Sequence, residues 1–468
     1  MAETEATRYP DLSRTRRVHL IGAGGAGMNA IGSVLLSMGH QVSGSDAVDS
    51  AALRRLSLLG AETHVGHSTR WLGQADVVAR STAIPADNVE VIEAPRRGLR
   101  VWRRSELLAA VCATRRVVAV SGTHGKTSTS SMLATVLRAG GLHPSMVVGG
   151  DVVGIGSGAS WDPEGDWLVV EADESDGTFL ELGAEAVVVT SVEPDHLDYY
   201  GTEEAMRSAF ARFVGEAPGP VVLCADDPGA AALARIDGIS SLTYGVSETA
   251  DVRIDDVSVG RSDSRFSLSA AGDPVGSARL PVPGLLYVRN AAAAVTMAHA
   301  LGVPWDVAMS GVEKYRGVAR RFELRGTRGG ITFIDDYGHL PGEVSATLAA
   351  AATGGWDRIV TVFQPHRYSR TQALWPQFAG AFGGSDVLVV TDVYGAGELP
   401  RPGVTGELIA KAVRQGGTGI DVRYAPTFDD VVTVLGHELR AGDLCLTLGA
   451  GDITTLPDRL IDMEQSDA

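Results

Sequence analysis

Residues 116–141 read RVVAVSGTHGKTSTSSMLATVLRAGG, and this stretch decides the fold class. The valine-rich run at residues 116–121 predicts a buried strand, and residues 127–139 are typical of a helix that two glycines then close. A glycine-containing turn, residues 122–126, lies between them. A buried strand, a turn and a helix in this order indicate an α/β domain with a parallel sheet.

The turn and the start of the helix carry the groups that a triphosphate requires. Glycines let backbone N–H groups approach the phosphates, a lysine serves the β- and γ-phosphates, and a hydroxyl can bind Mg²⁺. The loop is a shortened variant of G-x-x-x-x-G-K-[ST], because Val120 stands where the first glycine would be. The expected nucleotide ligands here are Gly122, Thr123, His124, Gly125, Lys126, Thr127 and Ser128.

Similar units precede and follow this one. Strand-helix alternation starts at residue 17, restarts at 116 and restarts again near 330, and 468 residues suit three domains at about 150 residues each. We therefore expect three α/β domains, residues 1–112, 113–318 and 319–468. The expected helices are residues 28–38, 127–139 and 290–301, and residues 252–280 suggest antiparallel strands. The expected parallel strands are residues 17–21, 41–44, 116–121, 167–170, 186–190, 220–224, 331–334, 358–363, 387–391 and 444–448.

Composition and charge exclude several classes of protein. With 44% hydrophobic and 21% charged residues the chain is typical of globular proteins. A net charge of -17 disfavours nucleic acid as a partner, and no apolar run is long enough to predict membrane insertion. Three widely spaced cysteines predict neither disulfides nor a zinc cluster, so we expect a cytoplasmic protein. Lysine occurs only at Lys126, Lys314 and Lys411, which favours a specific role for the one in the phosphate loop.

A second glycine-rich turn follows the first strand. Residues 22–27, GAGGAG, match G-x-G-x-x-G between a strand and a helix, and Asp46 ends the next strand. Such a turn can hold a diphosphate, and the acidic residue can accept a hydrogen bond from a ribose hydroxyl. The pattern alone does not separate NAD from a UDP-sugar, and a tight turn without a ligand is the third alternative.

Acidic residues follow two neighbouring strands of the central unit. EADESD, residues 171–176, follows one strand, and Glu171 is the best candidate ligand for Mg²⁺ because this cation prefers oxygen ligands. EPDHLD, residues 193–198, follows another strand and contains His196. Each segment could instead be a solvated acidic turn or a helix cap. The phosphate loop nearby favours a role at the ligand crevice.

Taken in order, nine motifs resemble those of the three-domain Mur ligases over residues 17–453. They are GAGGAGM, SGTHGKTS, EADESD, EPDHLDYY, RRFE, DDYGH, FQPHRYSRT, DVYGAGE and LGAGDI. The resemblance implies a Rossmann-like N-terminal domain that binds UDP, a P-loop-type central ATPase domain, and a Rossmann-like C-terminal domain for the amino acid. It therefore assigns the first glycine turn to UDP and not to NAD.

The resemblance also implies a reaction and roles. ATP would phosphorylate the lactyl carboxylate of UDP-N-acetylmuramate, and the amine of L-alanine would displace the phosphate, as in peptidoglycan precursor synthesis. Lys126, His196, His339 and Arg367 would be catalytic, with Mg²⁺ on Thr127, Glu171 and His196. ATP would also contact Asn290, Arg321 and Asp336, the last two after domain closure. The implied substrate ligands are Gly22, Gly24, Gly25, Gly27, Met28, Asp46, His67, Ser81, His366, Arg367 and Arg370.

Departures from the family pattern leave alternatives open. Leu286-Tyr287 replaces a usual His-Asn pair, and Leu340 replaces a second histidine. No lysine lies between His196 and Lys314, which resembles the alanine-adding branch and not siblings with a carbamylated lysine. The alternatives are a ligase that attaches a tripeptide to the same UDP-sugar and a noncatalytic UDP-sugar-binding relative. Without the family, residues 366–370 could be a solvated turn. We expect a monomer or a homodimer.

Overall fold

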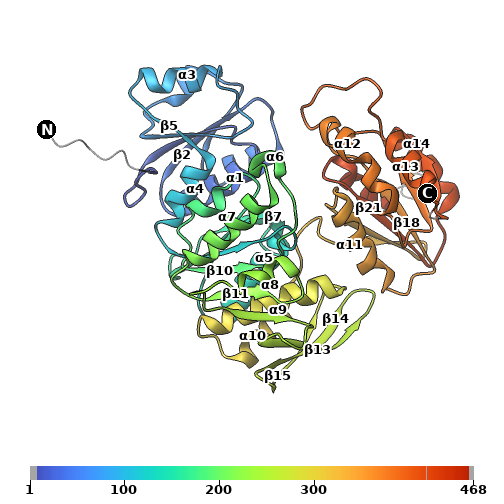
Figure 1. The fold of residues 1–468 in the computed structure, drawn as a ribbon. Coiled ribbons are helices and arrows are strands. Elements are labelled where there is room, and N and C mark those ends of the chain that lie inside the picture. The colour runs from blue at the N-terminus through green and yellow to red at the C-terminus, as the bar shows by residue number, and fades with distance from the viewer. Residues whose placement is uncertain (1–7, 418, 463–468) are drawn as a thin grey trace. The chain divides into compact units, whose positions relative to one another are not determined.

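The computed structural model describes residues 8–417 and 419–462, which fold into two compact units. The first unit contains residues up to 256, 266–278 and 289–316, and the second contains 257–265, 279–288 and the residues from 317 onward. Three sheets are present, of five, ten and six strands, and their layers of helix and strand can be followed in Figure 1. The predicted α/β class with three sheet-containing regions is confirmed.

The N-terminal sheet has the order β3-β2-β1-β4-β5, and all its pairs are parallel. β1 is buried from its second residue onward because valine, leucine and isoleucine face helices on both sides. The strands are β1 (Arg17–Ile21), β2 (Gln41–Asp46), β3 (Glu62–Val65), β4 (Val77–Arg80) and β5 (Val101–Arg103). The helices are α1 (Ala26–Ser37), α2 (Ala51–Leu58), η1 (Thr69–Leu72), α3 (Val89–Arg96) and α4 (Arg104–Cys112).

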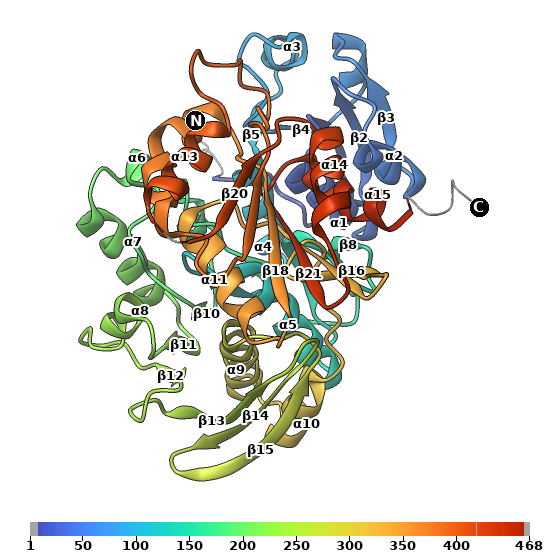
Figure 2. The same ribbon diagram turned by 90° about the vertical axis from the view of Figure 1, so that its right-hand side faces the viewer.

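The central sheet has the order β15-β14-β13-β12-β11-β10-β6-β9-β7-β8. Because β6 pairs in parallel with both β9 and β10, the loops that follow these three strands lie at one edge. The strands are β6 (Arg116–Ser121), β7 (Ser145–Val152), β8 (Ser157–Ser160), β9 (Trp167–Glu171), β10 (Ala186–Val189), β11 (Val221–Cys224), β12 (Leu242–Gly245), β13 (Val252–Val259), β14 (Ser264–Ala270) and β15 (Asp273–Leu280). Figure 2 shows β13, β14 and β15 side by side, where the sequence predicts polar strands.

Helices surround the central sheet, and α5 begins directly after the phosphate loop. Their apolar faces are buried, as in the alanine-rich stretch of α9. The predicted helix at 290–301 starts earlier, at Leu285. The helices are α5 (Lys126–Ala139), η2 (Thr178–Glu181), α6 (Leu197–Tyr200), α7 (Glu203–Gly215), α8 (Pro228–Leu233), α9 (Leu285–Ala300) and α10 (Trp305–Val312).

The C-terminal sheet has the order β16-β17-β21-β18-β19-β20, and only β16 is antiparallel to its neighbour. Figure 2 shows α11 and α13 on one side of it and α14 and α15 on the other. The strands are β16 (Glu323–Arg328), β17 (Ile331–Asp336), β18 (Arg358–Phe363), β19 (Val387–Val390), β20 (Asp421–Tyr424) and β21 (Asp443–Leu448). The helices are α11 (Pro341–Ala352), α12 (Tyr368–Leu374), η3 (Trp375–Gly380), α13 (Glu407–Gln415), α14 (Phe428–Glu438), η4 (Asp452–Thr455) and α15 (Leu456–Asp462).

Two further features bear on the sequence predictions. Among the described residues, no helix combines the length and the apolar character that a bilayer-spanning segment needs. Cys112, Cys224 and Cys445 are all buried free thiols.

Candidate active site

The phosphate loop is an open backbone cradle between β6 and α5. Gly122 and Gly125 have φ values of +134° and +82°, a region that side-chain-bearing residues rarely adopt. The loop after β10 holds the cradle: the His124 N–H donates to Ser191 Oγ at 2.9 Å, and the Thr190 hydroxyl donates to the His124 carbonyl at 2.5 Å. The loop conformation is therefore set by two neighbouring strands of the sheet.

Lys126 opens α5 and is paired with a residue that the motif reading did not select. Its Nζ donates to Glu174 Oε1 at 2.9 Å and to the Gly122 carbonyl at 2.8 Å. Glu174 is 2% exposed. Burial opposes the ammonium charge, but the Glu174 carboxylate beside it raises the pKa of Lys126 above its ordinary value. Lys126 is therefore a charged group in a dry site.

The predicted metal ligands lie around this pair. The Thr127 hydroxyl donates to Glu171 Oε1 at 2.9 Å, and the Gly149 N–H donates to Glu171 Oε2 at 2.5 Å. His196 has a φ of +53°, and its Nε2 lies 3.8 Å from Glu174 Oε1. Glu174 thus stands between the phosphate-loop lysine and His196. A hydroxyl, two carboxylates and an imidazole are a donor set that suits Mg²⁺ and phosphate.

Unsatisfied polar atoms mark the same region as ligand-binding. Glu174 Oε2 and Asn290 Nδ2 are buried and have no hydrogen-bond partner among the described residues. The Asn290 side chain lies against Gly125, so that a Cβ on Gly125 would come within 2.6 Å of Asn290 Oδ1. Buried polar groups are normally paired, and such orphans therefore fit a site that a polar ligand completes. Asn290 thus lies beside the phosphate loop, whereas Ser128 is buried in the first turn of α5.

The first glycine turn lies at the carboxyl edge of the N-terminal sheet. The Gly24 N–H donates to Asp46 Oδ2 at 2.9 Å, so the turn and the end of β2 are in contact. Gly22 has a φ of +84°, and a Cβ there would stand 2.9 Å from Ser81 Cβ. Gly25 is different, because its φ is −72° and a Cβ there would meet only the Gly22 carbonyl, at an ordinary 3.5 Å. Nothing in the described protein requires glycine at Gly25.

One basic side chain at this turn was missed by the sequence analysis. Arg104, the first residue of α4, lies over Gly27, with Nη1 3.3 Å from where a Gly27 Cβ would stand. Within the part of the chain that the structure describes, no carboxylate pairs with Arg104. The only signal in the sequence is a basic pair directly after a short strand, 77 residues from the turn in the numbering. Met28, by contrast, is buried in the core.

His67 lies at the same edge, just beyond β3. The Gly66 N–H donates to the Asp46 carbonyl at 2.7 Å, which joins this segment to the end of β2. His67 Nδ1 is 3.0 Å from Ser45 Oγ, and the imidazole is 17% exposed. The structure therefore brings Asp46, His67 and Ser81 together around one glycine turn.

The second unit brings its own predicted residues together. The rings of His339 and His366 meet edge to face at 5.5 Å, and His366 stacks on Tyr394 at 5.8 Å. Burial, with the nearby charges of His339 and Arg370, lowers the pKa of His366 to about 4. Arg370 Nη1 donates to His366 Nδ1 at 3.0 Å, so the hydrogen of the neutral ring is on Nε2. Arg367 is exposed and has a φ of +69°.

The carboxylate of Asp336 is hydrogen-bonded to residues of its own unit. It accepts the N–H groups of Phe322 and Gly338, both at 2.8 Å, and the Thr347 hydroxyl at 3.0 Å. Burial raises its pKa, an effect that Arg321 opposes. This bonding organises the segment around β17, and contacts of Asp336 and Arg321 with ATP stay predictions.

Two of the residues that replace the usual histidines and asparagine, Tyr287 and Leu340, have structural roles in the second unit. Tyr287 is buried, with its ring 6.4 Å from that of Phe322. Leu340 is the N-cap residue of α11, where its N–H donates to Glu343 Oε2 at 3.1 Å.

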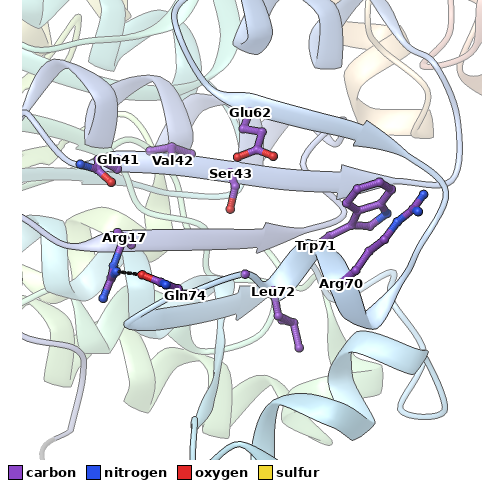
Figure 3. Close-up of a pocket in the computed structure, with 11 residues that line it drawn as sticks. Arg17, Gln41, Val42, Ser43, Glu62, Arg70, Trp71, Leu72 and Gln74 are labelled. Atoms are coloured by element: carbon purple, nitrogen blue, oxygen red, sulfur yellow. Dashed lines mark hydrogen bonds between the residues drawn. The ribbon is translucent and has the colours of Figure 1, made fainter.

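A separate polar pocket of about 170 Å³ lies at the opposite, amino end of the N-terminal strands (Figure 3). Arg70 lies over the Trp71 ring at 3.9 Å, and His64 stacks on the same ring at 3.6 Å. The pocket shares no residue with the glycine turn. It therefore lies apart from the predicted UDP site.

Comparison with known proteins was made at three levels. Family models match three successive segments: "Mur ligase family, catalytic domain" at residues 17–116, "Mur ligase middle domain" at 120–298 and "Mur ligase, glutamate ligase domain" at 320–451. The UDP-N-acetylmuramate–L-alanine ligase of Anaeromyxobacter sp. (strain Fw109-5) is 44% identical over 96% of this chain and 98% of its own. The enzyme of the same name from Thermobifida fusca is 45% identical over 99% of both chains.

Solved structures agree with these relatives. The UDP-N-acetylmuramate–alanine ligase MurC from Thermotoga maritima is 27% identical, with a TM-score of 0.83 over 97% of this chain and all of its own. A murein peptide ligase from Psychrobacter arcticus shares the fold, at 22% identity and a TM-score of 0.70, over 95% of this chain and 98% of its own.

Proposed function

Because the chain belongs to the Mur ligase family, we propose that it joins L-alanine to UDP-N-acetylmuramate at the expense of ATP. The protein is a carbon-nitrogen ligase of peptidoglycan precursor synthesis. The observation that carries this function is full-length identity of 44–45% to ligases named for that reaction. The dry phosphate loop around Lys126 and Glu174 supports it independently, because phosphoryl transfer from ATP needs such a site.

The chemistry follows from the poor reactivity of a carboxylate. An oxygen of the lactyl carboxylate attacks the γ-phosphorus of ATP, and the bond to ADP breaks. The alanine nitrogen then attacks the carbonyl carbon of the acyl phosphate, inorganic phosphate leaves, and the nitrogen gives up a proton. Positioning and charge neutralisation supply most of the catalysis in such transfers.

In the central site, Lys126 would hold the transferred phosphate, and Asn290 would contact ATP beside Gly125. Thr127 and Glu171 are proposed to hold one Mg²⁺ and His196 a second, and the ions would neutralise the phosphate charge. Gly122, Thr123, His124, Gly125 and Ser128 would form the rest of the cradle. Arg321 and Asp336 remain proposed ATP contacts from the second unit.

In the N-terminal site, the glycine turn would take the UDP portion. Gly25 supports this assignment, because the fold itself has room for a side chain at this position. A ligand bound close to the backbone would leave no such room, and the glycine is then explained by the ligand. Arg104, lying over Gly27, would pair with the diphosphate. Asp46, His67 and Ser81 would contact the uridine, while Gly22, Gly24, Gly27 and Met28 would shape the turn.

In the second unit, Arg367 and Arg370 would meet the alanine carboxylate and the acyl phosphate. His339 and His366 would line the same place, and neutral His366 would donate from Nε2. We also propose the domain limits 1–112, 113–318 and 319–468, and the matched family models begin in the same order at residues 17, 120 and 320. We place the reaction in the cytoplasm, since the buried cysteines are free thiols.

Phosphate release with UDP-N-acetylmuramate and ATP tests the function. We expect release that depends on both nucleotides and on L-alanine, with separate reactions containing L-serine, glycine or a tripeptide. Release with the tripeptide alone would support the recycling reaction instead. No release with any amine would contradict the ligase assignment.

A Lys126→Ala variant tests the assignment of the two nucleotide sites. Turnover should be abolished while calorimetric binding of the UDP substrate persists, because Lys126 lies in the central site. Loss of UDP-substrate binding would show that the two sites are misassigned.

A further inference from the structure

A buried carboxylate lies beneath the proposed uridine site without a lysine or arginine partner among the described residues. Glu90, in the first turn of α3, is 0% exposed, and no lysine or arginine pairs with it among residues 8–417 and 419–462. Burying an unpaired carboxylate is unfavourable unless hydrogen-bond donors surround it. A core position would accept an apolar residue at less cost. Glu90 therefore needs a reason other than packing.

Three donors converge on this carboxylate from different parts of the sheet. Oε2 accepts the Ser45 hydroxyl at 2.7 Å and His19 Nε2 at 3.2 Å, and Oε1 accepts the Ser68 N–H at 2.9 Å. Burial favours the neutral acid, but the bonds from His19 and Ser45 hold the pKa of Glu90 below its ordinary value. The Glu90 carboxylate is thus hydrogen-bonded to residues of β1, of β2 and of the segment after β3.

The two hydrogen bonds of the Ser45 hydroxyl determine the tautomer of His67. A carboxylate can only accept, so the single hydroxyl hydrogen of Ser45 is committed to Glu90. Ser45 Oγ must therefore accept from its other neighbour, His67 Nδ1, at 3.0 Å. The ring hydrogen of neutral His67 is consequently on Nδ1, and Nε2 carries a lone pair.

We propose that Glu90 is a positioning residue of the uridine site, which acts through Ser45 to present His67 Nε2 as a hydrogen-bond acceptor. The inference rests on the proposed function, which places UDP at this glycine turn. A nucleoside donor facing Nε2 is either the imide N–H of the base or a ribose hydroxyl. His67 is joined to the turn through Gly66 and Asp46, and its ring is partly exposed at that edge.

Calorimetric titration of the full chain with UDP at pH 8 tests the proposal. Glu90→Gln places an N–H₂ group among donors and should weaken UDP binding about tenfold, the loss of one good hydrogen bond. Glu93→Gln, on the same helix with its carboxylate paired to Arg97, should leave the affinity unchanged. In steady-state assays Glu90→Gln should raise the KM for the UDP substrate, with kcat and the KM for ATP within about twofold.

Analogues separate the two possible donors. N3-methyl-UDP lacks the imide hydrogen and 2′-deoxy-UDP lacks one ribose hydroxyl. The analogue that lacks the contacted donor should bind the wild-type chain about tenfold more weakly than UDP, and Glu90→Gln should not distinguish it from UDP. Nitrogen-15 NMR should find the His67 hydrogen on Nδ1 in the wild-type chain.

A purely structural role predicts a different pattern. Ser45→Ala keeps the donors from His19 and Ser68 to Glu90 but removes the hydroxyl that joins Glu90 to His67. It should therefore reproduce the weaker binding even where Glu90→Gln fails to fold. Unchanged UDP affinity in folded Glu90→Gln or in Ser45→Ala would overturn the proposal. Absence of UDP binding by the wild-type chain would overturn the proposed function itself.

Discussion

At the scale of single residues, Lys126 and Glu174 form the most consequential pair in the molecule. Removing one partner of a buried ion pair leaves an uncompensated charge, whereas removing both leaves none. Glu174→Gln should therefore lower the free energy of unfolding by about 2–4 kcal/mol. The double variant Lys126→Met/Glu174→Gln should recover at least half of that loss in urea unfolding. Additive losses in the double variant would show that the pair is not coupled.

His366 gives a pH prediction with a definite sign. Its pKa falls from an ordinary 6.5 to about 4, so the folded protein binds this proton less readily than the unfolded chain. The stabilising contribution is fully present above pH 6.5 and is lost as the pH falls towards 4. Between these limits the second unit should lose about 1–3 kcal/mol, allowing for partial exposure. His366→Gln should flatten this segment of the stability curve, and an unchanged slope would contradict the assignment.

At the scale of elements, the turn between β1 and α1 contains one glycine that the fold requires, Gly22, and one that only a bound ligand would require, Gly25. Gly22→Ala should reduce thermal stability, because its φ is positive and a Cβ would press on Ser81. Gly25→Ala should leave stability nearly unchanged and yet weaken UDP binding at least tenfold. Thermal unfolding and UDP titration of both variants measure the difference. Normal UDP affinity in Gly25→Ala would place the diphosphate elsewhere.

Several elements could be predicted because their burial is uniform. β1, β6 and β18 have the predicted bounds, since valine, leucine and isoleucine fill strands that are covered on both faces. Other strands lack that signal. β8 is built from small residues and β16 is polar and half-exposed, so neither shows an apolar run or a regular alternation.

The site was predictable in part for a similar physical reason. The spacing of the glycines, Lys126 and Thr127 predicts a phosphate loop from the sequence alone. Glu174 does not, because the four carboxylates of EADESD look equivalent until folding buries one of them beside a lysine. Arg104 was missed because its relation to Gly27 exists only in three dimensions.

At the scale of the whole molecule, the net charge of -17 repels the substrates, because the UDP-sugar and ATP are also anionic. Global repulsion is screened over about 10 Å at 0.1 M salt, whereas contacts inside the sites are screened much less. We therefore expect kcat/KM for the UDP substrate to rise about twofold as ionic strength increases from about 0.01 to 0.1 M, at fixed free Mg²⁺. A steep fall would show that local arginines dominate the encounter.

The scarcity of lysine and the burial of Lys126 have a practical consequence for handling the protein. Of the three lysines, Lys314 and Lys411 are exposed, whereas Lys126 is paired with the buried Glu174. Among the lysines, amine-reactive dyes or surfaces should therefore attach at Lys314 and Lys411 and spare the nucleotide loop. Because its exposed lysines are few and lie outside the nucleotide loop, the protein is suited to site-selective conjugation and to single-molecule or immobilised assays of its turnover.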